Sequence, residues 1–448
     1  MLYANSFEID ITPPLGTIIN GEFTCRYATE IADPLFAKAL YLRDDKVSQL
    51  FIVVDICVMR REFLDPLKME IEKLTGVPTS HQLISSTHTH YGGSVAALLM
   101  AHADLAYREL LRNRLLELAL RVSQDAVPAK IGFGKINKPE HLTCRRYLMA
   151  DSFEANNPVS HQLDHIKTNP LGSEDLIVER TTLPDSEVCY IGVKTLDDQW
   201  IGMLANYNLH YVGDCRRSTI TADYFGYFSR KVKGNIGNSD MVVMMSNGTS
   251  GEVNIWDFIQ GDRYPKEDHA KSKLIGEDIA DAVCTNLDDI IWEDKADLAI
   301  NYVDIELGLR KISVDDLEDA FELFSKTDYE ALSYLDPNLM NKVYAREQVL
   351  LTAYDASIVF PIQCFKIGNN LIGGLGGEFF TETGVSLKSQ FSNYFTICLA
   401  NDYVGYVPPK HEIEKGGYET WRARSSFLDE EAEEKIRNKM VEILNELS

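Results

Sequence analysis

Apolar and β-branched residues gather in short runs along the chain, and these runs predict buried strands. The runs cover residues 49–58, 82–86, 130–134, 188–193, 200–206, 241–246, 357–367 and 370–374. Continuous apolar runs of this length are typical of strands covered on both faces. Gly368-Asn369 separates the last two runs and predicts the turn of a hairpin.

Between these runs, apolar residues recur at helical spacing. Leu111, Leu115 and Leu118 form one such stripe. The spacing predicts helices over residues 63–74, 105–122, 268–287, 314–324, 341–353 and 429–447. Residues 151–179 show little periodicity, which favours a long functional loop or lid.

The alternation of strands and helices predicts an α/β fold with mixed sheets flanked by helices. No repeat, low-complexity tract or linker interrupts the pattern. We therefore expect residues 1–448 to form one large catalytic domain.

Charge and composition narrow the classes of partner. The chain has 44 Lys and Arg against 68 Asp and Glu, a net charge of −24. Such an acidic surface repels nucleic acids and anionic membranes, which favours a small-molecule substrate. No apolar run approaches the roughly 20 residues that a membrane span needs. The amino terminus lacks the basic and apolar regions of a signal peptide, so we expect a cytoplasmic protein, unless a signal has been removed.

The eight cysteines are scattered, without a CxxC pair, and most sit in apolar runs. Free thiols in a reducing compartment are the expected state. The sequence leaves the oligomeric state open.

The first candidate for chemistry is the segment 85–93, Ser-Ser-Thr-His-Thr-His-Tyr-Gly-Gly. Residues two apart on a strand face the same side, so we expect His88 and His90 to point together into one site. Paired histidines at the end of a strand, followed by glycines, are a frequent zinc geometry. The alternative is two polar residues satisfied by backbone groups.

Three further segments could complete such a site. His210 ends an apolar run. Taken alone, a histidine in this position is more often a buried imidazole hydrogen-bonded within the protein than a metal ligand. Glu378 follows a glycine-rich strand end, where a plain helix-start glutamate is equally expected. Tyr406 and Tyr418 lie on loops rich in glycine and proline, where they could ligate a metal, stabilise an oxyanion or simply pack. Cys215, near His210, leaves open a metal-free thiol mechanism.

Taken in order, these segments resemble the neutral/alkaline non-lysosomal ceramidase family. The opening Asp-Ile-Thr-Pro-Pro-Leu-Gly at 10–16, the run 32–55 and the loop 247–254 are also similar to that family. The resemblance covers the catalytic domain, and we expect the chain to lack the carboxy-terminal immunoglobulin-like domain of longer members.

The resemblance implies a zinc-dependent amidohydrolase acting on an N-acyl, lipid-like substrate. The implied zinc ligands are His88, His210, Glu378 and Tyr406. The implied residues around the substrate are His90, Arg145 with Arg146 as a rival, and Tyr418.

One position departs from the family pattern. Asn254 stands where the ceramidases carry a serine. Asparagine cannot act as a nucleophile, but it can donate a hydrogen bond to an oxyanion. We therefore expect zinc-dependent hydrolysis of an amide or ester, with a substrate that need not be ceramide. The alternative is a non-catalytic homologue that binds metal or lipid.

Overall fold

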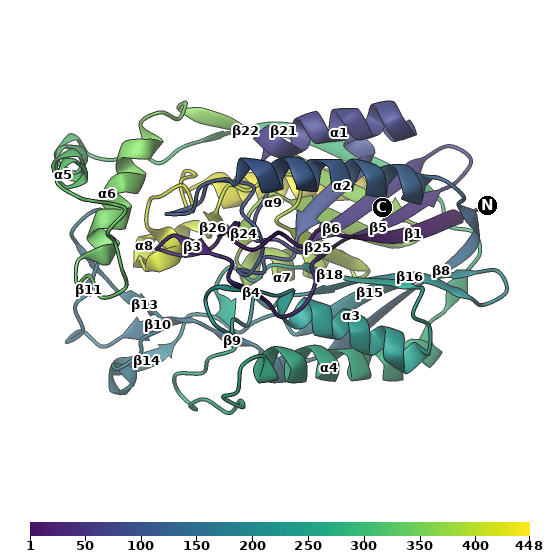
Figure 1. Cartoon of the computed structure of the whole chain (residues 1–448), viewed down its shortest axis with the longest axis horizontal. Helices are drawn as coiled ribbons and strands as arrows, with labels where there is room; N and C mark the ends of the chain where they lie inside the picture. Colours follow the sequence, from purple (N-terminus) through teal and green to yellow (C-terminus); the bar gives the residue numbers. More distant parts are fainter.

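The computed structural model describes residues 1–448, and a large mixed β-sheet runs through it (Figure 1). Its nine strands are β1 (Tyr3–Asp10), β5 (Phe36–Arg43), β6 (Ser48–Val54), β7 (Gln82–Ser86), β8 (Val127–Asn137), β15 (Glu187–Thr195), β16 (Trp200–Tyr207), β18 (Val242–Asn247) and β20 (Trp292–Glu293). The order is β18-β16-β15-β8-β1-β5-β6-β7, and β20 pairs with β8. Only the β6–β7 and β16–β18 pairs are parallel.

A second sheet packs on the inner face of the first. Its strands are β21 (Leu298–Gly308), β22 (Ser357–Ile367), β23 (Asn370–Leu375) and β25 (Tyr394–Cys398), paired in that order. Phe51 of the larger sheet meets Phe365 of the smaller one at a ring-centroid distance of 4.7 Å. Leu83, Ile372 and Ile397 belong to the same buried cluster between the sheets. Helices bury the other face of each sheet, so these strands are apolar on both faces.

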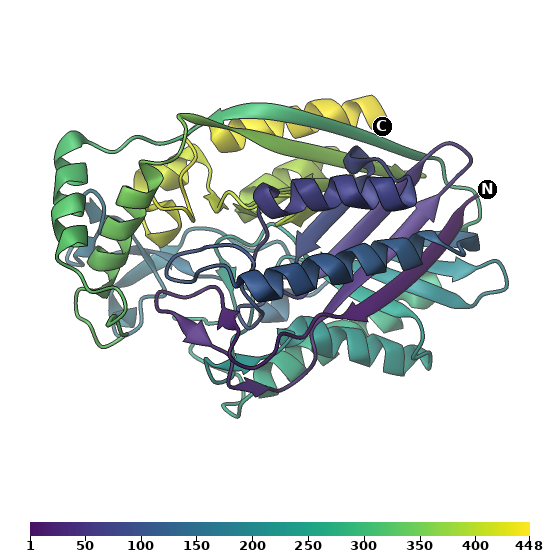
Figure 2. The ribbon, with the colours of Figure 1, turned by 45° about the horizontal axis from the view of Figure 1, so that its top comes forward.

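Helices cover the two outer faces, which gives four layers (Figures 1 and 2). The nine helices are α1 (Arg61–Thr75), α2 (Leu105–Ser123), α3 (Asp223–Ile236), α4 (Ala270–Thr285), α5 (Val314–Ser325), α6 (Leu339–Leu351), α7 (Thr381–Gln390), α8 (Lys410–Lys415) and α9 (Ala432–Leu447). α1 and α2 pack on β1, β5 and β6, while α3 and α4 pack on β15, β16 and β18. α7 and α9 pack on the smaller sheet, and α5 and α6 pair at one end of the molecule.

Short strands organise the loops beyond the sheets. β9 (Thr143–Cys144) pairs with β19 (Val253–Asn254), and β24 (Glu378–Phe379) pairs with β26 (Tyr406–Val407). β10 (Arg146–Met149) lies between β13 (Ile166–Thr168) and β14 (Ile177–Arg180). The other pairs are β2 (Ile18–Ile19) with β3 (Arg26–Tyr27), β4 (Glu30–Ile31) with β17 (Thr219–Ile220), and β11 (Ala155–Asn156) with β12 (Leu163–Asp164).

The predicted fold class is confirmed, with mixed sheets flanked by helices. The hairpin across Gly368 is also confirmed. Residues 151–179 differ from the prediction of a long loop, because β11, β12, β13 and the start of β14 lie within them. The placement of His88 and His90 on a strand was wrong: β7 ends at Ser86, and His88 has a left-handed φ of 71°.

No helix has the combination of length and apolar character that crossing a membrane requires. All eight cysteines are free, and five of them are buried. The expectation of free thiols in apolar surroundings therefore agrees with the structure.

Candidate functional site

Histidines and a glutamate from three strand ends meet at one end of the two sheets. His88 follows β7, His210 follows β16, and Glu378 begins β24, just after β23. His88 Nε2 lies 3.3 Å from Glu378 Oε2, and His210 Nε2 lies 3.5 Å from the same oxygen. All three side chains are buried. The structure thus brings together three of the four ligands that the resemblance implies.

Backbone carbonyls fix the orientation of both imidazoles. His88 Nδ1 donates to the carbonyl oxygen of Cys57 at 3.0 Å, and His210 Nδ1 donates to that of Ser250 at 3.1 Å. A carbonyl only accepts, so the proton of each neutral ring sits on Nδ1. The Nε2 lone pairs therefore face Glu378, as in metal-binding histidines whose other nitrogen is held by the protein.

The cluster contains buried polar atoms that no protein group satisfies. His210 Nε2 and Glu378 Oε2 are both buried and have no hydrogen-bond partner. Such orphaned atoms are rare in folded proteins, because each carries an uncompensated desolvation cost. Two imidazole nitrogens and a carboxylate are a common donor set for zinc. The residues therefore fit a zinc ion, which would satisfy the orphaned atoms.

Glu378 is held in its charged form by its neighbours. Burial raises the pKa of this carboxyl group, but without a metal the positive charge of a protonated imidazole at His88, and of His210 after it, outweighs burial and lowers the pKa to about 2. The Tyr403 hydroxyl donates to Glu378 Oε1 at 2.7 Å and supports the same state. One oxygen is thus anchored by Tyr403, while the other faces the histidines.

His90 lies beside this cluster. Its Nε2 is 3.2 Å from His88 Nε2, and its ring stacks on Tyr211 at a centroid distance of 3.7 Å. Burial lowers the pKa of His90, and the nearby His88 lowers it further, which favours the neutral imidazole. Its Nδ1 is buried without a partner. His90 is therefore placed to exchange a proton or a hydrogen bond with a group bound next to His88.

Cys57, His88 and His90 form a second group of potential metal ligands. Cys57 Sγ lies 3.8 Å from His88 Nδ1, the nitrogen on the far side of the ring from Glu378. One ion bound through a single nitrogen of His88 cannot reach both Cys57 and Glu378. Since Nδ1 already donates to a carbonyl, the set with Glu378 is the better supported.

Tyr406 is brought next to Glu378 by local strand pairing. The two residues are direct partners in the parallel β24–β26 pair, so their side chains lie on the same face. The Tyr406 hydroxyl accepts a hydrogen bond from Arg145 Nη2 at 2.9 Å. The ring of Tyr418 lies 5.6 Å from that of Tyr406 and makes an edge-on contact. The two predicted tyrosines therefore share one wall of the site.

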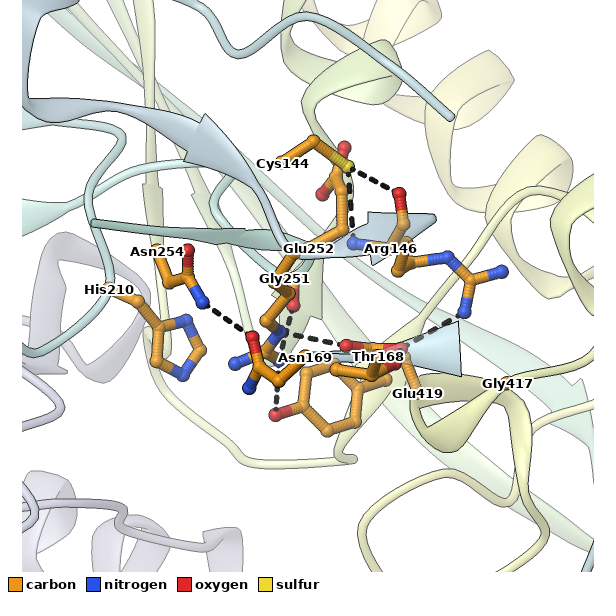
Figure 3. Close-up of polar contacts among 12 residues, drawn as sticks. Cys144, Arg146, Thr168, Asn169, His210, Gly251, Glu252, Asn254, Gly417 and Glu419 are labelled. Atoms are coloured by element: carbon orange, nitrogen blue, oxygen red, sulfur yellow. Dashed lines mark hydrogen bonds and ion pairs between the residues drawn. The ribbon is translucent and has the colours of Figure 1, made fainter. Parts of the chain in front are cut away.

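The two rival arginines have different partners, and Figure 3 shows Arg146 beside Glu419. Arg145 reaches Tyr406 and the carbonyl of Gly251, whereas Arg146 binds Glu412 at 2.9 Å. Glu419 joins them, with Oε1 2.7 Å from Arg145 Nε and Oε2 3.0 Å from Arg146 Nη1. Arg145 is thus the arginine that touches the site, and Arg146 acts only through this buried network.

Asn254 lies on β19 with its amide engaged at both ends. Its Oδ1 accepts from the backbone N–H of Trp256 at 3.0 Å, and its Nδ2 donates to Asn169 Oδ1 at 2.8 Å. Figure 3 shows the hydrogen bond between the two amides, with His210 drawn in the same view. Asn254 keeps one N–H that is free for a ligand, because a primary amide has two donors.

Some residues of the site were not predicted from the sequence. Tyr211 directly follows His210, and Tyr403 lies three residues before Tyr406. This closeness in sequence was the available sign that they belong to the site. Gly21 carried no signal, although a Cβ at this position would lie 2.5 Å from the His90 ring. Glu419 stood next to Tyr418 in a motif, but only the fold reveals its arginine partners.

The thiol alternative receives little support. Burial raises the pKa of Cys215, and the carboxylates of Asp223 and Asp214 raise it further. A thiol with a raised pKa holds little thiolate at neutral pH, and thiolate is the nucleophilic form.

Comparison with solved structures identifies the architecture. The crystal structure of neutral ceramidase from Pseudomonas aeruginosa superposes with a TM-score of 0.70, over 98% of this chain and 73% of that chain. This chain has the neutral ceramidase fold. A structure described as ceramidase complexed with C2 matches it with a TM-score of 0.69, over 98% of this chain and 74% of that chain.

Sequence identity to each of these ceramidases is only 13%. No family model and no curated protein sequence matches the chain. The neutral ceramidase fold is therefore retained here with a largely different sequence, and the chemistry must be argued from the residues themselves.

Proposed function

We propose that the protein is a zinc-dependent hydrolase of amide or ester bonds, and that residues 1–448 act as one catalytic domain. Its substrate would be a small or lipid-like N-acyl compound. The observation that carries the proposal is the convergence of His88 Nε2, His210 Nε2 and Glu378 Oε2, with two of these atoms buried and unpartnered. The neutral ceramidase fold supports the same reaction class.

The proposed ligands are His88, His210 and Glu378, with Tyr406 as the fourth. A zinc ion held there would supply Lewis acidity at the scissile carbonyl and a nucleophilic water at neutral pH. Tyr403 and the two backbone carbonyls would hold the ligands in place.

The remaining residues handle the substrate and its protons in this proposal. Neutral His90, next to His88, is suited to accept or return a proton. Arg145 carries a positive charge between Tyr406 and Tyr418, where negative charge on the substrate oxygen or leaving group would be stabilised. Asn254 can add one N–H donor, but no nucleophile.

A second candidate function is metal or ligand binding without catalysis. The observation in its favour is the Asn254 amide, which is tied to Asn169 and Trp256; the resemblance matches Asn254 with the serine of the ceramidases. The two candidates agree on metal binding and differ on turnover.

Metal analysis with an activity panel tests the proposal. We expect about one zinc ion per purified chain, and its loss in His88→Ala and His210→Ala. His411→Ala is the matched control, because His411 is half-exposed and pairs with Glu382 away from the cluster. The panel compares N-acyl amides and esters of different acyl length, with and without a chelator.

The outcomes separate the candidates. Chelator-sensitive hydrolysis supports the proposed enzyme, and tightly bound zinc without any turnover supports the binding protein. Activity that survives chelation in a zinc-free protein contradicts the proposed hydrolase.

A further inference from the structure

A cleft of about 510 Å³ lies on the other side of the wall that carries Tyr418. Three segments line it, at residues 157–165, 310–316 and 413–422. The first belongs to the stretch that the sequence predicts to be a functional loop. Trp421 lines the cleft and also contacts the Tyr418 ring, at a centroid distance of 6.0 Å. The cleft and the candidate site therefore share a wall.

Two adjacent arginines in this cleft lack an acidic partner. Arg310 donates only to neutral oxygens, the carbonyls of Thr420 and Ser426 and the Ser426 hydroxyl. Arg422 donates to the carbonyl of Arg310 at 2.8 Å and to the side-chain oxygen of Gln348 at 2.7 Å. Arg310 Nε is buried without any partner. In a protein with a net charge of −24, such a pair is conspicuous.

No carboxylate pairs directly with either guanidinium group. Burial and the positive charge of Arg422 together lower the pKa of Arg310 to about 10, while the carboxylate of Glu430 acts in the opposite direction. An arginine keeps its charge even so, because neutrality would need a pH far above the physiological range. An anion bound between the two guanidinium groups would offset the desolvation cost of the buried charge. It would also reduce the repulsion between the two arginines. Lys311 is exposed at the same cleft and adds a third positive charge.

The acids that line the cleft do not fill this role. Asp164 already accepts from the backbone N–H of Gly417 at 2.9 Å and from Trp421 Nε1 at 2.6 Å. Asp316 accepts from Ser313, the cap of α5. Glu414 and Glu430 also line the cleft, and both are exposed, whereas Arg310 and Arg422 are partly buried. Partly buried cations among exposed acids favour a small anion with one or two charges over a polyanion, which the acids would repel.

We propose that this cleft binds a small anionic ligand, through a carboxylate or phosphate group held by Arg310 and Arg422 with help from Lys311. The proposal does not depend on metal binding. The anion has two conceivable sources, a free small anion or the acidic head of an N-acyl substrate that spans the shared wall. Arg310 donates a hydrogen bond to the carbonyl of Thr420, which lies two residues beyond Tyr418. An anion bound to Arg310 would therefore affect the position of the segment that carries Tyr418.

Calorimetric titration with inorganic phosphate at constant ionic strength tests the site. We expect saturable binding to the wild type, and about a tenfold higher Kd in Lys311→Glu, since one reversed charge near the anion is worth that much in a partly screened cleft. Lys46→Glu is the matched control, because it makes the same charge change at an exposed position outside the cleft. Arg422→Gln should abolish binding, with circular dichroism confirming its fold.

Absence of saturable phosphate binding to the wild type would overturn the proposal. An equal loss of affinity in Lys46→Glu would do the same, because it would mean a diffuse charge effect. Lys311→Glu keeps the test decisive if Arg422→Gln does not fold.

Two further probes distinguish the sources of the anion. N-acetylglycine and the neutral N-acetylglycinamide are titrated into the wild type and into His88→Ala. Equal affinity of N-acetylglycine and phosphate in both proteins supports a free anion as the ligand. Tighter binding of N-acetylglycine that weakens in His88→Ala supports a substrate head group. Binding of the neutral amide as tightly as the acid contradicts an anion site.

Discussion

The residues around the candidate site are charged, buried and mutually dependent. Glu419 has no exposed side-chain surface and binds two arginines at once, while Thr168 donates to it at 2.7 Å. Burial raises the pKa of Glu419, but Arg145 and Arg146 outweigh burial and hold the pKa below its ordinary value. A buried charge of this kind acts mainly by fixing the position of its partners. Glu419 thereby positions Arg145 against Tyr406.

The Glu419→Gln substitution tests this positioning role. Removing the charge leaves two buried arginines with one carboxylate fewer, and we expect the free energy of unfolding to fall by about 3 kcal/mol. We also expect kcat to fall while zinc content stays unchanged, since Glu419 contacts Arg145 and none of the proposed ligands. Urea unfolding, metal analysis and steady-state kinetics measure the three quantities.

Glu412→Gln is the control for that substitution. Glu412 binds Arg146 and Lys415 but has no contact with Arg145, and Arg146 keeps Glu419 in this variant. We expect a smaller loss of stability and an unchanged kcat. Equal kinetic effects in the two variants would show that Glu419 has only a general structural role.

The sequence could predict which residue types form the site, but not which of two neighbours faces it. Arg145 and Arg146 are adjacent in similar surroundings, so composition and spacing treat them alike. Their roles separate because successive side chains of an extended backbone point to opposite sides. The partners that decide the matter, Tyr406 and Glu419, lie more than 250 residues away.

At the scale of elements, the loop between β2 and β3 covers the histidine cluster. Gly21 in this loop has a φ of 96°, and a Cβ there would lie 2.5 Å from Cγ and Nδ1 of His90. Arg26 of β3 donates to the carbonyl of His90 at 2.6 Å and ties the loop to the same residue. The position of His90 therefore depends on a close backbone approach that only glycine allows.

Gly21→Ala should displace the His90 ring, because the added methyl group cannot fit against it. We expect a lower kcat with zinc content retained. Gly16→Ala is a matched control, since Gly16 has a similar φ of 89° but open space where its Cβ would lie. Both variants should lose about 1–2 kcal/mol of stability from the left-handed backbone. A kcat that is equally affected in both would contradict a specific contact with His90.

Helices and strands were predictable where the pattern of apolar residues within the segment alone sets its bounds. The strands β7 and β22 begin and end where the apolar runs do, because all of β7 and residues 360–365 of β22 are buried on both faces. Helix α3 was missed, although Tyr224, Phe225, Phe228 and Val232 are buried at helical spacing. The turn that carries His88 was not predictable, since its left-handed conformation depends on hydrogen bonds to the β6 end, at Val54 and Ile56.

At the scale of the whole molecule, a buried lysine lies where the two sheets are linked through Asn401; we call this place the sheet joint. Lys68 of α1 donates to Asn401 Oδ1 at 3.0 Å and has no carboxylate partner. Asn401 in turn donates to Gln363 of β22 at 2.6 Å and accepts from the backbone of Ile84 in β7. No single-sequence pattern reveals this joint, because pairing of the two sheets is a property of segments hundreds of residues apart.

The buried lysine predicts a dependence of stability on pH. Burial lowers the pKa of Lys68 from 10.5 to about 7 in the folded protein, whereas the unfolded chain keeps its proton to a pH of about 10.4. Between these values the unfolded state binds more protons, so the free energy of unfolding rises with pH, by at most about 1.4 kcal/mol per unit. Below a pH of about 7 both states are protonated, and this contribution is constant.

Lys68→Met removes this titration and preserves the length of the side chain. We expect the difference in unfolding free energy, wild type minus variant, to increase as pH rises from about 7 to about 10, as followed by urea unfolding at a series of pH values. Lys46→Met, at an exposed lysine, should run parallel to the wild type. A parallel profile for Lys68→Met would mean that Lys68 stays charged in the folded protein. The sheet joint would then have to supply an anion or water that stabilises this charge.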